Sequence, residues 1–471
     1  MKEGRIDLLL YNNLVVNYNS KRYRPFLFNL VSGRRRLLSE AEFELIKSRE
    51  TCGENNEEWR RFFYQLIGEK QFLTDEMRTE VEKSLVDTGY WAKRNKHAED
   101  YRFSIELTRD CNLKCSFCYA KNRGEAEALT PEKIDAIYRF YEKYADDSNK
   151  IQETPYIRIT GGEPLITAES ALMIRYVAEK WKKAKIDLFT NGINLKKYFN
   201  CLPVERFNEV VVSLDGPKEI HLKHRMGNSR LYADIYKDIL NGIKLLLEKR
   251  VKVRINTILD RYNYLYFGEL KELLLREGIL NDPNCSQTVN VTIDFKNELG
   301  IKEEVNNAKD VRIIEKYLEK FDVSLVTYQS EQKLKSIMAR QDKGPYLPSC
   351  TRCNKERLAN CYFGCDGKVY HCDCVVGDEG LIGSFYPEAH IEEDNVREIY
   401  NSTILDQTKC KSCVYKFVCL GGCALNARGK GMKMDCGIFE YEDIINNIEF
   451  DYYGLLRYDA YKRFVDSERR N

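Results

Sequence analysis

The chain has 471 residues, 43% of them apolar and 12% aromatic, which is enough to bury a sizeable core and to form two or three domains. Its 75 lysines and arginines nearly balance 73 acidic residues, and the net charge of +2 argues against a nucleic-acid or membrane-surface binder that works by bulk charge. No stretch approaches the roughly 18 apolar residues that cross a bilayer, and the N-terminus lacks the pattern of a signal peptide. We therefore expect a cytoplasmic protein without nucleic-acid or membrane partners.

The first 95 residues predict a small α+β module. Apolar segments IDLLLYNNLVV and FLFNLV predict two strands, and SEAEFELIKS predicts a helix with Ser39 and Glu42 as a capping box. The run EEWRRFFYQLIGEKQFL predicts a second helix, an order that suggests a winged-helix-like fold. The segment KRYRPFLFNLVSGRRR carries six basic residues and no acid, so it either attracts an acidic partner or is a solvated basic hairpin.

The middle of the chain alternates short apolar strands with helices. Strands are predicted at residues 103–108, 156–162, 186–192, 209–216 and 253–259. The helical stretch TPEKIDAIYRFYEKYA has Thr130 as its expected N-cap and Pro131 at its first helical position. Repeated strand and helix units predict an α/β fold with a parallel sheet, open or curled towards a barrel, whose chemistry sits at the carboxyl ends of the strands.

Three cysteines follow the first of these strands, in the segment CNLKCSFCYA: Cys111, Cys115 and Cys118. Three thiolates suit zinc badly, because a structural zinc site closes with four protein ligands, whereas a four-iron cluster can leave one iron open. Glycines follow the next three strands, at Gly161, Gly162, Gly192 and Gly216. Glycine is expected where the backbone turns tightly or approaches a ligand, so four strand ends are predicted to share one site.

The tail is dense in cysteine. Of the 17 cysteines, eleven lie between residues 350 and 436, and in a reducing cytosol metal binding or redox chemistry is the usual reason for many thiols. The segment CKSCVYKFVCLGGC reads C-x2-C-x5-C-x3-C, gaps that suit a zinc ribbon badly. In CYFGCDGKVYHCDC, the pair Asp366 and Gly367 predicts the turn of a hairpin. The isolated Cys52, Cys201 and Cys285 are expected to be small buried hydrophobes.

The spacing C-x3-C-x2-C followed by an aromatic, with GGEP after the next strand, resembles the radical S-adenosylmethionine (SAM) family. The resemblance implies a partial (β/α)6 TIM-like barrel and a [4Fe-4S] cluster on Cys111, Cys115 and Cys118, which are both its metal ligands and the catalytic residues. It also implies that the open iron chelates SAM, and that an external one-electron donor of flavodoxin or ferredoxin type drives cleavage to a 5′-deoxyadenosyl radical, which takes hydrogen from the substrate.

The same resemblance, over roughly residues 100–300, implies the contacts to SAM. The segment TGGEP is similar to the one that receives the methionine amino group, and VSLDGPKEIHLKHR is similar to the one that reaches the ribose. The implied SAM-binding residues are Phe117, Gly161, Gly162, Glu163, Pro164, Ser213, Asp215 and Arg225. For His221, His224 and His371 we expect surface or hydrogen-bonded structural roles.

The tail resembles the seven-cysteine SPASM extension, which implies two auxiliary [4Fe-4S] clusters. The implied ligands of the first are Cys350, Cys353, Cys372 and Cys423. Those of the second are Cys410, Cys413, Cys419 and Cys436. The pattern does not require Cys361, Cys365 or Cys374, which either replace a ligand, contact substrate or are plain buried thiols.

These resemblances predict three domains: a peptide-recognition-like module at 1–95, the radical SAM barrel at 96–335 and the SPASM domain at 336–471. The function implied is maturation of a ribosomally made precursor peptide, whose leader is bound by the first module as an added strand. A thioether cross-link is favoured and a carbon-carbon link comes next. The alternatives are an anaerobic sulfatase maturase that forms formylglycine and, more distantly, a zinc-binding scaffold.

Overall fold

The computed structural model describes residues 8–10, 13–16, 26–29, 35–52, 57–68, 102–115, 117–118, 120, 124, 127–145, 155–226, 234–291, 313–314, 316–321, 323, 361–373 and 380–396. These residues form two sheets, one of four strands and one of ten.

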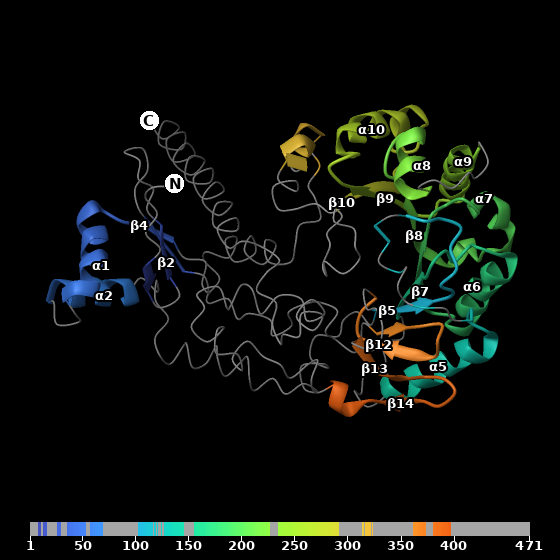
Figure 1. Ribbon diagram of the computed structural model, residues 1–471, viewed down its shortest axis with the longest axis horizontal. Coiled ribbons are helices and arrows are strands. Elements are labelled where there is room, and N and C mark those ends of the chain that lie inside the picture. The colour runs from blue at the N-terminus through green and yellow to red at the C-terminus, as the bar shows by residue number, and fades with distance from the viewer. Residues whose placement is uncertain are drawn as a thin grey trace, which may run out of the picture.

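Six parallel strands form one side of the ten-stranded sheet, with β10 at the edge (Figure 1). They are β5 (Arg102–Glu106), β6 (Tyr156–Thr160), β7 (Lys185–Thr190), β8 (Phe207–Ser213), β9 (Val253–Leu259) and β10 (Cys285–Val291), neighbours in that order. The predicted α/β fold with a parallel sheet is therefore confirmed, and within the described residues the sheet is open rather than closed into a barrel. Of these strands β10 was not predicted, because CSQTVNV has no apolar run.

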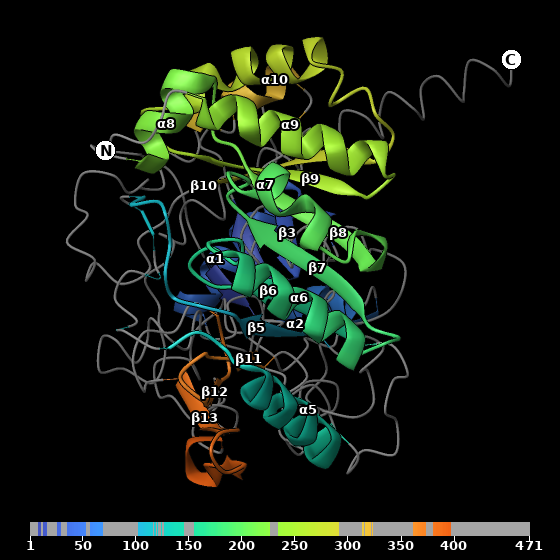
Figure 2. The ribbon, with the colours of Figure 1, turned by 90° about the vertical axis from the view of Figure 1, so that its right-hand side faces the viewer.

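Helices connect the parallel strands and pack along one face of the sheet (Figure 2). They are α5 (Pro131–Ala145), α6 (Ala168–Lys180), α7 (Leu195–Tyr198), α8 (Lys218–Met226), α9 (Ile235–Glu248) and α10 (Phe267–Arg276). Short 3-10 segments lie at Phe199–Cys201, Val204–Arg206, Tyr264–Tyr266 and Glu319–Phe321. The expected start of α5 is confirmed, since the Thr130 hydroxyl accepts a hydrogen bond from the Lys133 amide at 3.4 Å.

Alternation along the strands builds the core between sheet and helices. In β6, Ile157 and Ile159 are fully buried while the residues between them are partly exposed, and β9 repeats the pattern with Val253 and Ile255. Each such side chain contributes about 1.5–3 kcal/mol by leaving water. Because one face of every strand is committed to the helices, the chemistry of the molecule is left to the strand ends and the opposite face.

A hairpin from the tail extends the same sheet. The strands β11 (Tyr362–Phe363) and β12 (Lys368–Tyr370) are antiparallel and enclose Asp366 and Gly367, as predicted. The sequence did not predict that β11 pairs in parallel with β5, which places Phe363 beside Ile105. Two further strands, β13 (Leu381–Ser384) and β14 (His390–Ile391), continue the sheet. The sheet thus crosses the predicted domain boundary at residue 335, which itself stays a prediction.

The N-terminal segment forms the four-stranded antiparallel sheet and two helices. Its elements are β1 (Leu8–Leu10), β2 (Asn13–Val16), β3 (Phe26–Asn29), β4 (Arg35–Leu37), α1 (Glu40–Cys52) and α2 (Glu57–Gly68). The structure has four strands where two were expected, because the first apolar segment is itself a hairpin and β4 adds a basic edge. The capping box is confirmed: Ser39 N–H donates to Glu42 Oε2 at 2.7 Å, and Glu42 N–H donates to Ser39 Oγ at 3.2 Å.

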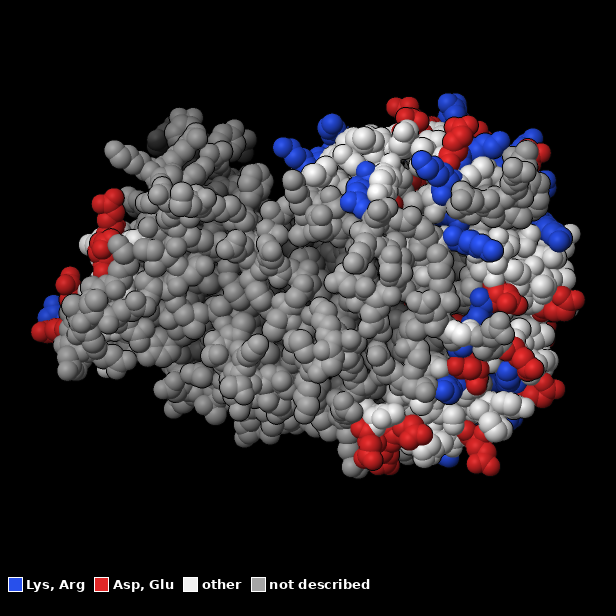
Figure 3. Space-filling model, in the orientation of Figure 1, with Lys and Arg blue, Asp and Glu red and all other residues white. Residues whose placement is uncertain are grey.

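Charged side chains of both signs are interspersed over the described surface in Figure 3, in keeping with the balanced composition. Among the described residues no helix combines the length and the apolar character that crossing a membrane requires.

Candidate active site

The three cysteines lie on a loop that leaves the carboxyl end of β5, here called the cysteine loop (residues 108–118). Residues after β6 hold its first half, because Gly162 N–H donates to Thr108 O at 2.7 Å and Glu163 N–H donates to Asp110 O at 2.8 Å. A Cβ on Gly161 would stand 2.3 Å from Thr108 O, and one on Gly162 would stand 2.3 Å from Asp110 O. The paired glycines therefore let the two loops touch backbone to backbone.

The carboxylate of Glu163 is turned into the protein and is 1% exposed. It accepts hydrogen bonds from Thr190 Oγ1 at 2.6 Å, from Asn191 N–H at 2.7 Å and from Leu165 N–H at 2.9 Å. Burial raises the pKa of Glu163, and these bonds oppose the rise. Glu163 thus joins the ends of β6 and β7, while its backbone, rather than its carboxylate, faces the cysteine loop.

A second anchor was not predicted from the sequence. Asn191, directly after β7, donates from Nδ2 to Asn112 Oδ1 at 2.7 Å, in the middle of the cysteine loop. The segment LFTNG was noticed only for its glycine, although an asparagine at a strand end beside a glycine is itself a signal for a loop contact.

The thiols of the cysteine loop form an electrostatically coupled group. Cys115 is buried and Cys118 half-buried, whereas Cys111 is exposed. Burial raises the pKa of the Cys115 thiol to about 11; Arg225 opposes this and Cys118 adds to it. Among the described residues no three histidine, cysteine or acidic side chains stand in a closed metal-binding arrangement. The donor set nevertheless fits an iron-sulfur cluster, since thiolates are the ligands that hold such clusters and a cationic centre stabilises their charge.

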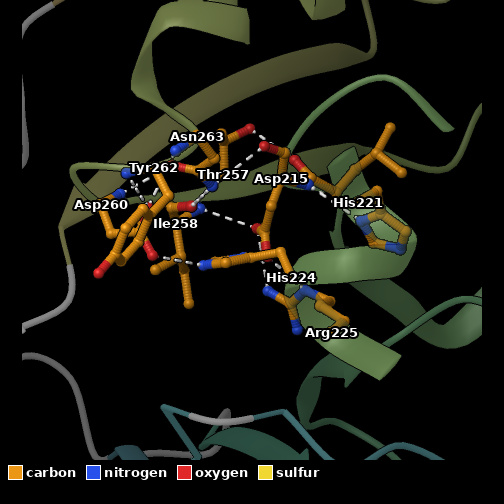
Figure 4. Close-up of polar contacts among 10 residues, drawn as sticks. Asp215, His221, His224, Arg225, Thr257, Ile258, Asp260, Tyr262 and Asn263 are labelled. Atoms are coloured by element: carbon orange, nitrogen blue, oxygen red, sulfur yellow. Dashed lines mark hydrogen bonds and ion pairs between the residues drawn. The ribbon is translucent and has the colours of Figure 1, made fainter. Parts of the chain in front are cut away.

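The opposite wall of the site is built on Asp215, just after β8 (Figure 4). Its fully buried carboxylate accepts from Arg225 Nε at 2.6 Å, from His224 Nδ1 at 2.8 Å and from Ile258 N–H at 2.9 Å. Burial alone would raise the pKa of Asp215, but Arg225 and His224 outweigh it and hold that pKa well below its ordinary value. The carboxylate is ionised and serves as the hub that orients α8.

Two histidines one turn apart on α8 differ in charge, since one ring is neutral and the other is protonated. His221 Nδ1 accepts from Asp215 N–H at 3.1 Å, and burial lowers the pKa of His221 to about 3, so this ring is neutral. Burial also disfavours charge on His224, yet its bonds to Asp215 and to Asp260, at 3.1 Å, raise its pKa to about 9. The structural, hydrogen-bonded roles expected for both rings agree with this geometry.

Phe117 connects this wall to the cysteine loop. Its ring stacks on the ring of His224 with centroids 4.4 Å apart and planes at 29°. The guanidinium carbon of Arg225 lies 5.5 Å from the same ring centroid. The structure therefore brings Phe117, Asp215 and Arg225 together as predicted site residues should be, and adds His224 and Asp260, which sequence reasoning did not place there.

The remaining predicted SAM contacts border the same strand ends. Pro164 is buried in the turn after Glu163, and Ser213 is the last, half-buried residue of β8. That these residues bind SAM stays a prediction, as do the contacts assigned to Gly161, Gly162 and Asp215.

The tail cysteines divide between two faces of the hairpin. Cys361 and Cys365 are buried in the main core, whereas Cys372 packs in a separate cluster with Tyr362 and Tyr370. The extra Cys374 lies outside the described residues. So do all predicted tail ligands except Cys372, namely Cys350, Cys353, Cys410, Cys413, Cys419, Cys423 and Cys436.

This geometry defines an α/β enzyme whose candidate active site lies at the carboxyl ends of the strands of an open parallel sheet. Residues 105–274 match the model of the radical SAM superfamily. This range runs from the end of β5 through β9 and contains the cysteine loop and the Asp215 wall. Residues 105–274 thus form a radical SAM domain.

Known relatives agree with this assignment. A cysteine-type anaerobic sulfatase-maturating enzyme of Clostridium novyi is 23% identical over 350 residues, which cover 67% of this chain and 86% of that protein. A GTP 3',8-cyclase of Helicobacter pylori is 25% identical over 315 residues, 64% of this chain and 88% of that protein.

Two solved structures share the fold. Native anSMEcpe with bound AdoMet has a TM-score of 0.55 and 19% identity, and the match covers 76% of this chain and 97% of that one. SuiB of Streptococcus suis bound to its precursor peptide SuiA has a TM-score of 0.51 and 17% identity, with 88% of this chain and 97% of that one covered.

Proposed function

We propose that this radical SAM enzyme matures a ribosomally made peptide by installing a cross-link, with a thioether favoured and a carbon-carbon link next. The observation that carries the proposal is the extent of structural similarity: the match to SuiB covers 88% of this chain, whereas the match to anSMEcpe covers 76%. SuiB was solved with a precursor peptide bound. Because the match to SuiB includes more of this chain than the match to anSMEcpe does, we infer a precursor peptide as the substrate.

Cys111, Cys115 and Cys118 would hold a [4Fe-4S] cluster whose fourth iron is left to SAM. When bound, this cluster supplies the electron that cleaves SAM and so provides the radical for hydrogen abstraction. The chain itself positions the three thiols. Gly162 and Glu163 fix the start of the cysteine loop, and near the end of this loop Phe117 packs against His224 of α8. The SAM contacts proposed are those of Phe117 and the segments 161–164, 213–215 and Arg225.

The tail would carry two auxiliary clusters on the ligands named above, in a SPASM domain. A thioether forms when a peptide thiol and a peptide C–H lose two hydrogen atoms between them. The radical takes the C–H hydrogen, so the thiol proton passes to solvent and one electron must still leave as the C–S bond forms. An auxiliary cluster is the proposed acceptor of that electron, and the external flavodoxin- or ferredoxin-type donor supplies the one that starts the reaction.

The first module would bind the leader of the precursor. Its four-stranded sheet ends in β1 and β4, and an extended peptide can add to a sheet edge through main-chain hydrogen bonds. β4 contributes Arg35 and Arg36 to the basic segment, and Arg36 pairs with Glu42. An acidic leader would be attracted to this edge; a basic hairpin that binds nothing stays the alternative.

Formylglycine formation is the second candidate, and the 23% identity to the Clostridium novyi sulfatase maturase favours it. The two products differ chemically, because formylglycine is an aldehyde that labels with hydrazide reagents and a cross-linked peptide is not. The more distant zinc-scaffold alternative predicts zinc and no iron.

The test is anaerobic reconstitution with iron and sulfide, followed by a SAM cleavage assay on the wild type and on the Cys111, Cys115 and Cys118 triple alanine variant. About twelve irons per chain, with 5′-deoxyadenosine formed by the wild type and not by the variant, supports the proposal. Cysteine-rich precursor peptides are then offered and analysed for the loss of two hydrogens. Zinc in place of iron, or an aldehyde product, contradicts it.

A further inference from the structure

His224 bridges two buried carboxylates that come from the ends of two strands (Figure 4). Nδ1 contacts Asp215 Oδ2 at 2.8 Å and Nε2 contacts Asp260 Oδ2 at 3.1 Å, while the side chains of the two acids are 0% and 4% exposed. An ionised carboxylate only accepts hydrogen bonds, so both ring nitrogens of His224 donate and the ring is an imidazolium. With both nitrogens held, the plane of the ring is fixed.

The face of that ring carries Phe117, at a centroid distance of 4.4 Å. Phe117 lies between Cys115 and Cys118 in the sequence, so its position determines where the chain turns from one thiol to the next. A fixed imidazolium under an aromatic ring combines stacking with cation–π attraction. No other ring–ring contact of Phe117 occurs in the described part of the chain.

The two halves of the cysteine loop are therefore held by different elements. The half from Thr108 to Asp110 rests on the backbone after β6. The half that contains Phe117 is held by a side chain of α8, whose orientation is set by acids after β8 and β9. Cys115 and Cys118 belong to the second half.

We propose that His224 is a positioning residue that fixes Phe117, and through it the geometry in which Cys115 and Cys118 are presented to their metal centre. The inference rests on the proposed binding of an iron-sulfur cluster and SAM at this loop. It goes beyond that proposal by making the Asp215–His224–Asp260 bridge a determinant of how well SAM is bound.

His221 provides a matched control. It lies on the same helix, is 2% exposed and contacts the same residue, Asp215, but its ring meets Tyr236 edge-on at 5.7 Å and not Phe117. Asparagine preserves a polar group near the Nδ1 position of either histidine. His224→Asn also leaves no acid without a donor, because Asp215 keeps Arg225 and Asp260 keeps the amide of Tyr262 at 2.7 Å.

The experiment is a SAM titration of the reduced, reconstituted enzyme, followed by electron paramagnetic resonance, since only a cluster with an open iron responds to SAM. We expect His224→Asn to raise the titration midpoint about tenfold and His221→Asn to leave it within about twofold of the wild type. Equal midpoints for wild type and His224→Asn, or equal shifts in both variants, overturn the inference. A wild type without a SAM-responsive signal contradicts the proposed function instead.

A double-variant cycle separates positioning from general destabilisation. If His224 acts through Phe117, adding His224→Asn to Phe117→Leu changes the midpoint little beyond Phe117→Leu alone. Additive effects overturn the proposed route. Should His224→Asn show no cooperative thermal unfolding, Asp260→Asn decides, because it loosens one side of the bridge and keeps the shape: a midpoint about threefold higher supports the inference and an unchanged midpoint overturns it.

Discussion

Arg109, at the start of the cysteine loop, donates from Nη2 to Asp366 Oδ2 in the turn of the tail hairpin, at 2.6 Å. The same guanidinium donates from Nε to Glu106, at 3.1 Å, the last and fully buried residue of β5. Glu106 in turn accepts from the backbone N–H of Cys365 at 3.3 Å and is 3.5 Å from its thiol. A single junction around the buried Glu106 therefore joins the loop of the proposed SAM cluster to the hairpin that carries Cys372.

We expect Arg109→Gln to release the hairpin. The change leaves the buried Glu106 carboxylate without its cation, which costs about 3–5 kcal/mol of unfolding free energy. The double variant Arg109→Gln with Glu106→Gln removes both charges and should recover most of that loss. Urea unfolding of the iron-free protein measures the stability, and exchange of the Ser104 amide, which donates to Cys361 O, reports on the junction.

The matched control is Arg254→Gln. Arg254 pairs with Glu209 at 2.7 Å, but both side chains are about a quarter exposed, at 27% and 23%, so the expected cost is below about 1 kcal/mol. Equal costs for Arg109→Gln and Arg254→Gln would contradict the idea that burial makes the Arg109 junction special.

Substitutions of the tail cysteines should differ in their effect on the iron content of the reconstituted protein. Cys365 and Cys361 face the core of the sheet, away from Cys372, and burial together with Glu106 raises the pKa of Cys365 to about 12. We expect Cys372→Ala to lower the reconstituted iron from about twelve to about eight per chain and Cys365→Ala to leave it unchanged. Iron and sulfide counts measure this, and loss of iron in Cys365→Ala would make it a ligand.

Gly162→Ala is expected to abolish SAM cleavage. Its Cβ would stand 2.3 Å from Asp110 O and 2.5 Å from Arg109 O, and both atoms are backbone, so the cysteine loop must move as a whole. Gly278→Ala is the control, because that Cβ meets nothing within 4 Å and only the φ of +75° is strained, at about 1–2 kcal/mol. Comparable cleavage rates in the two variants would show that the close approach does not matter.

Much of this site could be predicted from the sequence, because its signals are local. Strand alternation, the Thr130 cap and the glycine pair at 161–162 each arise from a few neighbouring residues, and the structure has them where the sequence put them. The parallel pairing of β11 with β5 involves only two residue pairs more than 250 positions apart, and no local pattern encodes such a contact.

The charge of His224 could not be predicted from the sequence either. It depends on Asp260, 36 residues away, and on the parallel pairing that places the ends of β8 and β9 side by side. Read alone, the segment EIHLKHR gives its two histidines the same pKa, and only the fold separates them.

This separation predicts how the stability of the iron-free protein changes with pH. The folded pKa of His224, about 9, lies above its ordinary value near 6.5, so its contribution is fully present below pH 6.5 and is lost as pH rises through 9. The loss amounts to about 3 kcal/mol for a shift of this size. His221 acts in the opposite sense: its folded pKa of about 3 means that stability falls as pH drops below 6.5.

We therefore expect the unfolding free energy to be highest near pH 6.5 and the difference between wild type and His224→Asn to shrink from pH 6.5 to 8.5. The thiols are common to both proteins, so their titration cancels in this difference. Asp215, Asp260 and Arg225, which face His224, keep their charges throughout this pH range, so the slope belongs to the imidazolium. Urea unfolding at four pH values measures it, and parallel curves for the two proteins would mean that His224 is neutral in the fold.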